Sequence, residues 1–322
     1  MTDVCNTVDR NAVIMAYRLI LGREPESEAV VDAALRGYET IPRLRKGFLE
    51  SPEFTASFAV PVQARTPLEW ENESRIDINC GPEQMQQLFG RVAQTWTELG
   101  NSEPYWSVLS ADKHKRDAFE KHEEHFWETG HRDVARFFAW LNRNDIRIDP
   151  GHVCLEYGCG TGRATRALAP RFRKILACDI SSAHLELARQ HTAGVGEIEF
   201  CHIRSTESLD LPASFDVLYS EIVLQHNPPP VIAYILEKLL RALKPNGIAF
   251  FQLPTFILGY SFDIDKYIST TNCGAMEMHV LPQRYLFQVV EKCNCQVLEF
   301  REDDKTGSAD YVSNTVLLRK RS

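Results

Sequence analysis

The chain has 322 residues, of which 44% are hydrophobic and 25% charged, the ordinary composition of a globular protein with room for one large and one small domain. Its net charge of −8 lacks the basic excess expected of a nucleic-acid-binding protein. Because no apolar run approaches the ~18 residues that span a bilayer, and no signal-peptide pattern opens the chain, we predict a cytoplasmic protein without membrane insertion.

The first sixty residues (1–60) are predicted to form a small helical domain. Apolar residues from Val13 onward follow helical spacing. A second helix is predicted after Ser27 and a third after Thr40, because both residue types cap helix N-termini. Residues 61–88 are rich in proline and poor in periodicity, and we predict a linker there.

Two short sequences in this domain are distinctive, LGREP at residues 21–25 and FLESPEF at residues 48–54. They resemble those of a short helical domain of undefined role that is often attached to glycan-processing and cell-surface-biosynthesis enzymes. The resemblance covers only this domain and implies no catalytic group. It implies a docking surface for another protein or for a second copy of the chain, or a helical extension that packs on the main domain.

Helical patterns recur over residues 85–99 and 113–142, and residues 89–150 are predicted to form a helical cap ahead of the core. Tyr105 and Trp106 stand side by side between these helices. We expect them either to close over a ligand or to pack the helices onto the core.

Strands and helices alternate through the core, residues 151–322, which indicates an α/β fold. Strands are predicted at residues 152–157, 174–179, 197–202, 215–220, 247–253, 296–301 and 311–318. Helices are predicted at residues 161–169, 182–191, 229–243 and 282–293, and residues 255–278 form an insertion. Only a loop joins the last two strands, so they must run antiparallel. The pattern thus predicts a seven-stranded, mostly parallel sheet with one antiparallel strand.

The sequence EYGCGTGR at residues 156–163 directly follows the first strand of the core. Glycines at every second position allow the backbone to approach a ligand closely, and the next helix directs its free N–H groups at the same loop. Glu156, just ahead of the glycines, would repel a pyrophosphate but attract a cationic amino group. We therefore favour the amino-acid end of S-adenosylmethionine (SAM) over a dinucleotide, whose GxGxxG fingerprint also has a different spacing.

Three further motifs follow in order: CDIS at residues 178–181, FDVLYS at 215–220 and LKPNG at 243–247. Together with the glycine loop they resemble the class I SAM-dependent methyltransferases, and the resemblance covers residues 89–322. It implies a Rossmann-like fold and SAM as cofactor. The cofactor-binding residues that we expect are Glu156, Gly158, Cys159, Gly160, Gly162, Asp179 and Ile180, with Tyr105 and Trp106 as a possible cover.

The resemblance implies that Asp179 accepts hydrogen bonds from both ribose hydroxyls, which suits a carboxylate. Many relatives carry an aspartate after the third strand that binds the adenine amino group, but this chain reads HIRST at residues 202–206. We therefore expect Ser205, Thr206 or a backbone group to contact the adenine.

Methyl transfer depends mainly on holding the acceptor in line with the methyl group, but an alcohol also benefits from a base. His226 lies past the fourth strand, at the sheet edge where ligands of open α/β sheets bind. His279 follows the insertion that should cover the acceptor. Glu221 is a third candidate, with a SAM contact or a helix cap as its other possible roles, and both histidines have a structural role as the alternative.

The sequence NPPP at residues 227–230 differs from the NPPY-type motif of amino methyltransferases, because it lies well past the strand end and Pro230 replaces the aromatic residue. Its prolines are explained by the start of a helix. We therefore predict O-methylation of a small-molecule or glycan-type acceptor, the glycan preference resting on the N-terminal resemblance. N-methylation of a small amine or amino sugar and a catalytically inactive SAM-binding module are the alternatives. No metal-ligand spacing is present, so we expect no metal.

Overall fold

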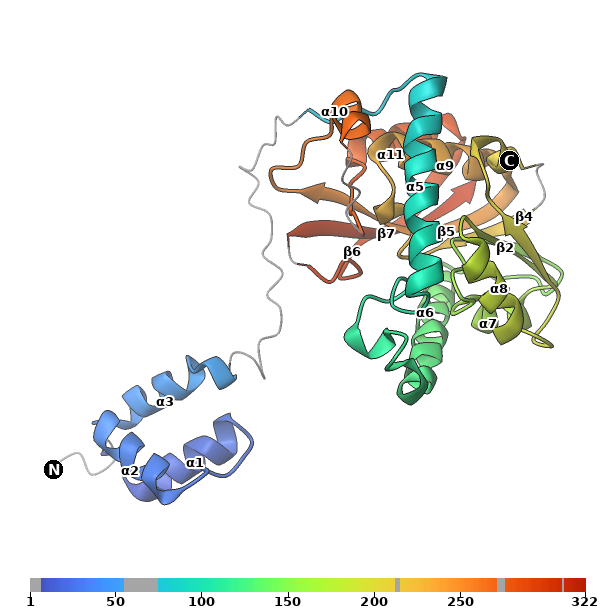
Figure 1. The fold of residues 1–322 in the computed structure, drawn as a ribbon. Coiled ribbons are helices and arrows are strands. Elements are labelled where there is room, and N and C mark those ends of the chain that lie inside the picture. The colour runs from blue at the N-terminus through green and yellow to red at the C-terminus, as the bar shows by residue number, and fades with distance from the viewer. Residues whose placement is uncertain (1–6, 55–74, 212–214, 271–275, 309) are drawn as a thin grey trace. The chain divides into compact units, whose positions relative to one another are not determined.

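The computed structural model describes residues 7–54, 75–211, 215–270, 276–308 and 310–322. The chain divides into two compact units, residues 1–65 and residues 66–322 (Figure 1). The two units are described separately.

The smaller unit includes the helices α1 (Arg10–Ile20), α2 (Glu28–Gly37) and α3 (Ile41–Leu49). Thr40 caps α3 as predicted, because its hydroxyl accepts a hydrogen bond from the Arg43 amide at 3.4 Å. Ser27 precedes α2 without a side-chain cap. The helices bury one small apolar cluster, formed by Val13, Ala16, Val31, Leu44 and Phe48.

The two distinctive sequences of the smaller unit are joined by an ion pair. Arg23, from LGREP, donates from Nη2 to Glu53 Oε2, from FLESPEF, at 2.7 Å, and its Nε donates to the same carboxylate. A bidentate pair of this kind is geometrically specific. The ion pair therefore makes the two sequences one structural feature, which joins the turn after α1 to the residues that follow α3.

The larger unit is built on one seven-stranded sheet with the strand order β3-β2-β1-β4-β5-β7-β6. The strands are β1 (Val153–Tyr157), β2 (Lys174–Asp179), β3 (Ile198–His202), β4 (Phe215–Ser220), β5 (Leu243–Ile257), β6 (Cys295–Asp303) and β7 (Tyr311–Lys320). Strands β1 to β5 pair in parallel, whereas β7 lies between β5 and β6 and is antiparallel to both. The predicted sheet with one antiparallel strand is thus confirmed.

Helices cover both faces of this sheet. They are α5 (Pro82–Ser102), α6 (Glu123–Arg143), α7 (Thr165–Leu168), α8 (Ser182–His191), α9 (Pro229–Ala242), α10 (Ile264–Ser269) and α11 (Gln283–Lys292). Side chains alternate between the faces along each strand, so Leu155 packs in the cluster with α9 and α11 and Cys154 in the cluster with α6 and α7. Helix α5 packs against α8, α9 and α10 (Figure 1).

Two predicted helices of the larger unit are shorter in the structure. The helix expected over residues 113–142 begins only at Glu123 and is preceded by the short 3-10 turns η1 (Asp112–His114) and η2 (Phe119–Lys121). These turns bring Phe119 onto Tyr105, with the ring centroids 3.5 Å apart, so tertiary packing overrides the helical periodicity. The helix expected over residues 161–169 is reduced to α7, because Gly162 has a φ of +90° and cannot be helical.

The linker expected over residues 61–88 is shorter at its C-terminal end. Helix α5 already begins at Pro82, where the Gln84 side chain accepts a hydrogen bond from the Gly81 amide at 3.1 Å. Ahead of it, Ile76 forms an isolated bridge with Phe262 in the insertion. Residues 55–74 of the expected domain end and linker, and residues 271–275 of the insertion, lie outside the described residues.

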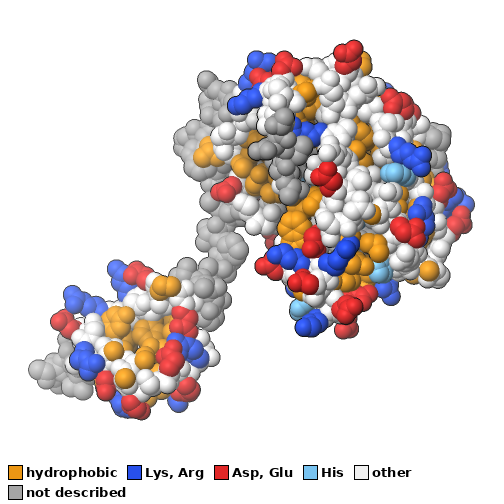
Figure 2. Space-filling view, in the orientation of Figure 1, with side chains coloured by type: hydrophobic (Ala, Val, Ile, Leu, Met, Phe, Trp, Pro, Cys, Tyr) orange, Lys and Arg blue, Asp and Glu red, His pale blue; other side chains and the backbone are white. Residues whose placement is uncertain are grey.

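On the face in view in Figure 2, positively and negatively charged side chains of the larger unit are interspersed, with apolar patches between them. In the described parts of the chain, every helix is too short or too polar to cross a membrane. The seven cysteines that fall in those parts are free thiols, of which Cys80 and Cys201 are half-buried and the others buried.

Candidate active site

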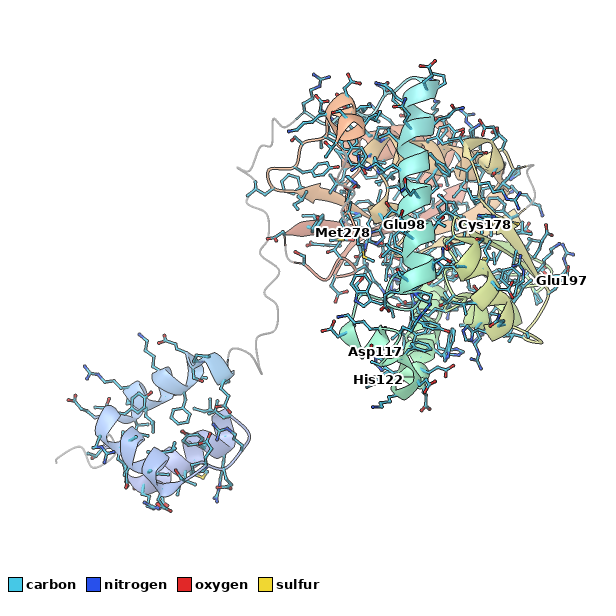
Figure 3. The ribbon with its side chains drawn as sticks, in the orientation of Figure 1. Glu98, Asp117, His122, Cys178, Glu197 and Met278 are labelled. Carbon is cyan, nitrogen blue, oxygen red and sulfur yellow. The ribbon has the colours of Figure 1, made fainter. Side chains whose placement is uncertain are left out.

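A cavity that is partly open to solvent lies at the carboxyl ends of β1, β2 and β4, the edge of an open α/β sheet where ligands bind. Helix α5, marked by Glu98 in Figure 3, and strand β2, marked by Cys178, are two of the elements that contribute lining residues. The lining comprises Val92, Trp96, Ser107, Val108, Glu156, Tyr157, Gly158, Cys159, Gly160, Arg163, Ala164, Asp179, Ile180, His184, Tyr219, Glu221, Ile222, Val223 and Asn227.

Glu156 is a buried acid in this cavity, with only 3% of its surface exposed. Its Oε2 atom has no hydrogen-bond partner among the described residues. Burial raises the pKa of Glu156 to about 8, although the Thr165 hydroxyl and the Arg163 guanidinium act to lower it. A cationic amino group at this position would supply the missing partner and stabilise the ionised carboxylate. The site therefore fits the amino group of SAM.

Asp179, at the end of β2, lines the same cavity and also fixes the glycine loop. Its Oδ2 accepts a hydrogen bond from the Gly160 amide and its Oδ1 one from the Ser181 amide, each at 2.8 Å. Each carboxylate oxygen has a second lone pair for a ligand hydroxyl. At Gly160, with a φ of +53°, a Cβ atom would lie 2.7 Å from the Val108 side chain, so only glycine fits here.

The loop after α5 reaches the cavity, but with residues other than those expected. Ser107 and Val108 contribute to the lining, whereas Tyr105 and Trp106 do not. The Tyr105 ring is stacked on Phe119, and its hydroxyl lies 2.8 Å from His191 Nε2 on α8. Of the two roles considered for this aromatic pair, Tyr105 therefore packs the helices.

Ser107 continues the attachment of this loop to α8. Its hydroxyl lies 3.0 Å from Nε2 of the buried His184. Nδ1 of His184 in turn lies 3.7 Å from Asp179 Oδ1. Two histidines of α8, His184 and His191, thus attach this loop to the helix beside the cavity.

Of the predicted cofactor-binding residues, Gly162, Ser205 and Thr206 do not contribute to the lining. A Cβ atom at Gly162 would approach Ala188 of α8 and Thr192, the residue that follows this helix, so the glycine permits close packing between loop and helix. Ser205 begins the 3-10 turn η4 (Thr206–Leu209), which packs against α5 and α9. The structure therefore does not bring Ser205 or Thr206 to the cavity, and the alternative of a backbone contact to the adenine stays a prediction.

Of the three candidate bases, only Glu221 is a lining residue. Glu221 accepts hydrogen bonds from Arg136 and from the Tyr219 hydroxyl, and Lys305 lies 3.7 Å away. These partners hold it as an ion-paired carboxylate.

His226 is buried behind Trp96, whose ring centroid lies 5.1 Å from its own. Its Nδ1 lies 3.0 Å from the Glu277 carbonyl oxygen and its Nε2 3.2 Å from Gln225 Nε2, so both ring nitrogens are engaged. Burial lowers the pKa of His226 to about 4. The imidazole is therefore neutral at pH 7 but presents no open lone pair to the cavity.

His279 does not line the cavity and contacts residues of the insertion. Its Nδ1 is 2.7 Å from the Tyr260 hydroxyl, and its Nε2 is 3.4 Å from Glu277 Oε2. These contacts place His279 in the packing of the insertion. Sequence reasoning thus selected the right neighbourhood but not the geometry.

Sequence reasoning missed several lining residues that come from elements distant in the chain. Trp96 on α5, Tyr219 on β4 and Asn227 after the 3-10 turn η5 (Leu224–His226) are examples. Arg163, the last residue of the glycine sequence, was also missed although it stood beside the chosen residues. Its positive charge at the end of the glycine sequence was the available signal. Within the described residues, no group of three or more His, Cys, Asp or Glu side chains is arranged to hold a metal ion.

Residues 154–247 match a family model described as a methyltransferase domain. The strand order, the glycine loop and this match agree. Residues 154–247 therefore belong to a methyltransferase domain.

Among solved structures, this methyltransferase domain is similar to magnesium protoporphyrin IX methyltransferase from Synechocystis PCC 6803 with bound SAH, with a TM-score of 0.50 and 17% sequence identity. The similarity covers 72% of this chain and 100% of that one, and at this identity it shows the fold alone.

Curated relatives of the methyltransferase domain include the ubiquinone biosynthesis O-methyltransferases of Idiomarina loihiensis and Paracidovorax citrulli. The first is 35% identical over 104 residues, which are 32% of this chain and 42% of that enzyme. The second is 32% identical over 142 residues, or 39% of this chain and 58% of that enzyme. The chain therefore spans about half the length of these relatives.

Proposed function

We propose that the chain transfers a methyl group from SAM to an oxygen atom of a small-molecule acceptor. The observation that carries this proposal is the buried, unpaired carboxylate oxygen of Glu156 in the cavity at the sheet edge. SAM supplies a methyl group that its sulfonium activates for transfer. Glu156 would bind the amino group and Asp179 the ribose hydroxyls, while the loop with Ser107 and Val108 excludes water.

Oxygen is favoured over nitrogen as the acceptor atom by two observations. The curated relatives described above carry O-methyltransferase in their names. Asn227, the first residue of NPPP, donates from its amide to the carbonyl oxygens of Val223 at 3.0 Å and Leu224 at 3.4 Å. Its amide nitrogen thus stabilises the loop.

The state of the candidate bases also bears on the acceptor. Both ring nitrogens of His226 are engaged, His279 lies outside the cavity, and Glu221 is ion-paired. An acceptor hydroxyl that is already ionised near neutral pH, such as that of an acidic phenol or a carboxylic acid, needs no strong base. Such an acceptor fits the site better than the alcohol of a glycan.

Calorimetry with SAM and with S-adenosylhomocysteine tests the cofactor assignment, and failure of the intact protein to bind either ligand would refute it. A panel of phenols, carboxylic acids, sugars and amines, analysed by mass spectrometry for a gain of one methylene, then tests the acceptor class. We expect the gain on phenolic or carboxylic oxygen. A gain only on sugar hydroxyls or amines would contradict the proposed acceptor, and binding without any gain would favour a catalytically inactive SAM-binding module.

We expect His226→Asn to lower kcat less than tenfold on the acceptor found in this panel, because the imidazole is held by its neighbours and does not face the cavity. A general base typically contributes roughly 100- to 10,000-fold. Steady-state kinetics between pH 5 and 9 measures the effect, with SAM affinity as the control. A loss of more than about 100-fold in kcat with unchanged SAM affinity would identify His226 as the base after all.

A further inference from the structure

Arg163 is a buried cation in the wall of the cavity, with 5% of its surface exposed. Its Nη1 donates to Asp133 Oδ2 at 2.6 Å and to the Thr129 hydroxyl at 3.2 Å. Its Nε has no hydrogen-bond partner in the described parts of the chain. A buried guanidinium N–H without an acceptor is costly, which points to a missing ligand.

Helix α6 fixes this arginine in place. Thr129 and Asp133, one turn apart on the helix, hold its side chain, and Gly130 between them packs against its backbone. Although burial opposes ionisation, Arg163 and Lys305 lower the pKa of Asp133 to about 2. Asp133 is therefore ionised and holds Arg163 in a fixed orientation before any ligand binds.

The charges around the cavity leave a positive excess on this side. The ion-paired network contains the carboxylates Asp133 and Glu221 and the cations Arg136, Arg163 and Lys305. The cations outnumber the carboxylates by one. Glu156 also interacts electrostatically with Arg163, but burial keeps its carboxyl group largely protonated near pH 7. An anionic ligand group beside Arg163 would balance the network.

We propose that Arg163 binds the α-carboxylate of SAM through its Nε–H group and forms, with Glu156, a two-sided clamp for the amino-acid zwitterion. The two buried side chains line one cavity, and each leaves unpaired the atom that the zwitterion would satisfy: a donor for the carboxylate and an acceptor for the ammonium. Asp133 and Thr129 are positioning residues that act through Arg163. This assignment rests on the proposed function.

The test compares SAM with decarboxylated SAM, which lacks only the carboxylate, by calorimetry on the full chain. The wild type is expected to bind SAM roughly 10- to 100-fold more tightly than the decarboxylated analogue, the range of a charge-assisted hydrogen bond. In Arg163→Met this preference is expected to fall to about threefold or less, because the variant loses affinity only for the ligand that carries the carboxylate.

Lys305→Met is the matched control, because Lys305 is a cation of the same network but not a lining residue. It is expected to keep the wild-type preference. Retention of the preference in Arg163→Met, or its equal loss in both variants, would overturn the assignment. Should Arg163→Met fail to fold by circular dichroism, Arg163→Lys keeps a cation for Asp133 without the Nε–H group, and the same loss is expected. Failure of the wild type to bind either ligand would refute the proposed function.

Discussion

Glu156→Gln is expected to weaken SAM binding about 100-fold or more and, at the same time, to stabilise the ligand-free protein by about 3 kcal/mol at pH 7. The binding loss follows because the amide cannot pair ionically with an amino group in a buried site. The stability gain follows from the pKa of about 8 that burial gives Glu156 in the folded protein, against 4.5 for an ordinary glutamate.

The sign of this stability effect follows from proton binding. Between pH 4.5 and 8 the unfolded chain carries an ionised Glu156 while the folded chain keeps it protonated, so the residue destabilises the fold increasingly as the pH rises. Glutamine resembles the protonated form at every pH. The gain is therefore expected to vanish near pH 4, where both states of the wild type are protonated.

Chemical denaturation of the ligand-free proteins at pH 4 and pH 7 measures this effect. Glu221→Gln is the matched control, because that buried carboxylate is ion-paired with Arg136 and its loss should destabilise the protein. If Glu156→Gln also destabilised the protein at pH 7, the raised pKa of Glu156 would be wrong. If the variant bound SAM as tightly as the wild type, Glu156 would have no role at the amino group.

Gly130→Ala is expected to destabilise the larger unit by about 3 kcal/mol or more and to abolish SAM binding. A Cβ atom at Gly130 would lie 2.1 Å from the carbonyl oxygen of Arg163, a backbone atom in the glycine loop. Relief of this overlap requires α6 to move away from the loop. That movement would pull Asp133 from Arg163 and deform the wall of the cavity.

Gly90→Ala on α5 provides the control for helix propensity, since a Cβ atom at Gly90 has no neighbour within 4 Å among the described residues. This substitution should stabilise the protein by about 0.5–1 kcal/mol, the usual benefit of alanine over glycine within a helix. Thermal unfolding and calorimetry with S-adenosylhomocysteine measure both variants. A Gly130→Ala protein as stable as Gly90→Ala, with unchanged ligand affinity, would show that α6 does not support the loop.

The sequence predicted most of the architecture, because alternating strands and helices, glycine turns and caps are local signals. The strands β2 and β4 and the helix α8 agree with their predicted bounds. The α6 region shows where local signals fail: residues 113–122 have helical periodicity, yet Phe119 is drawn onto Tyr105 from another segment. Periodicity reports which side chains are apolar but not which partner will bury them.

The sequence by itself predicted that Glu156, Gly158, Gly160 and Asp179 meet at the sheet edge, since β1, the glycine loop, α7 and β2 follow one another closely in the chain, and all four residues line the cavity. Only the tertiary structure decided which other residues join them. Thr129, Asp133 and Trp96 precede the glycine loop, and Glu221 and Lys305 follow it at very different distances along the chain. The packed structure leaves Glu156 Oε2 without a hydrogen-bond partner among the described residues. It also orients Arg163 through Thr129 and Asp133 and gives both ring nitrogens of His226 a partner. Those properties depend on neighbours that meet only when the helices pack on the sheet.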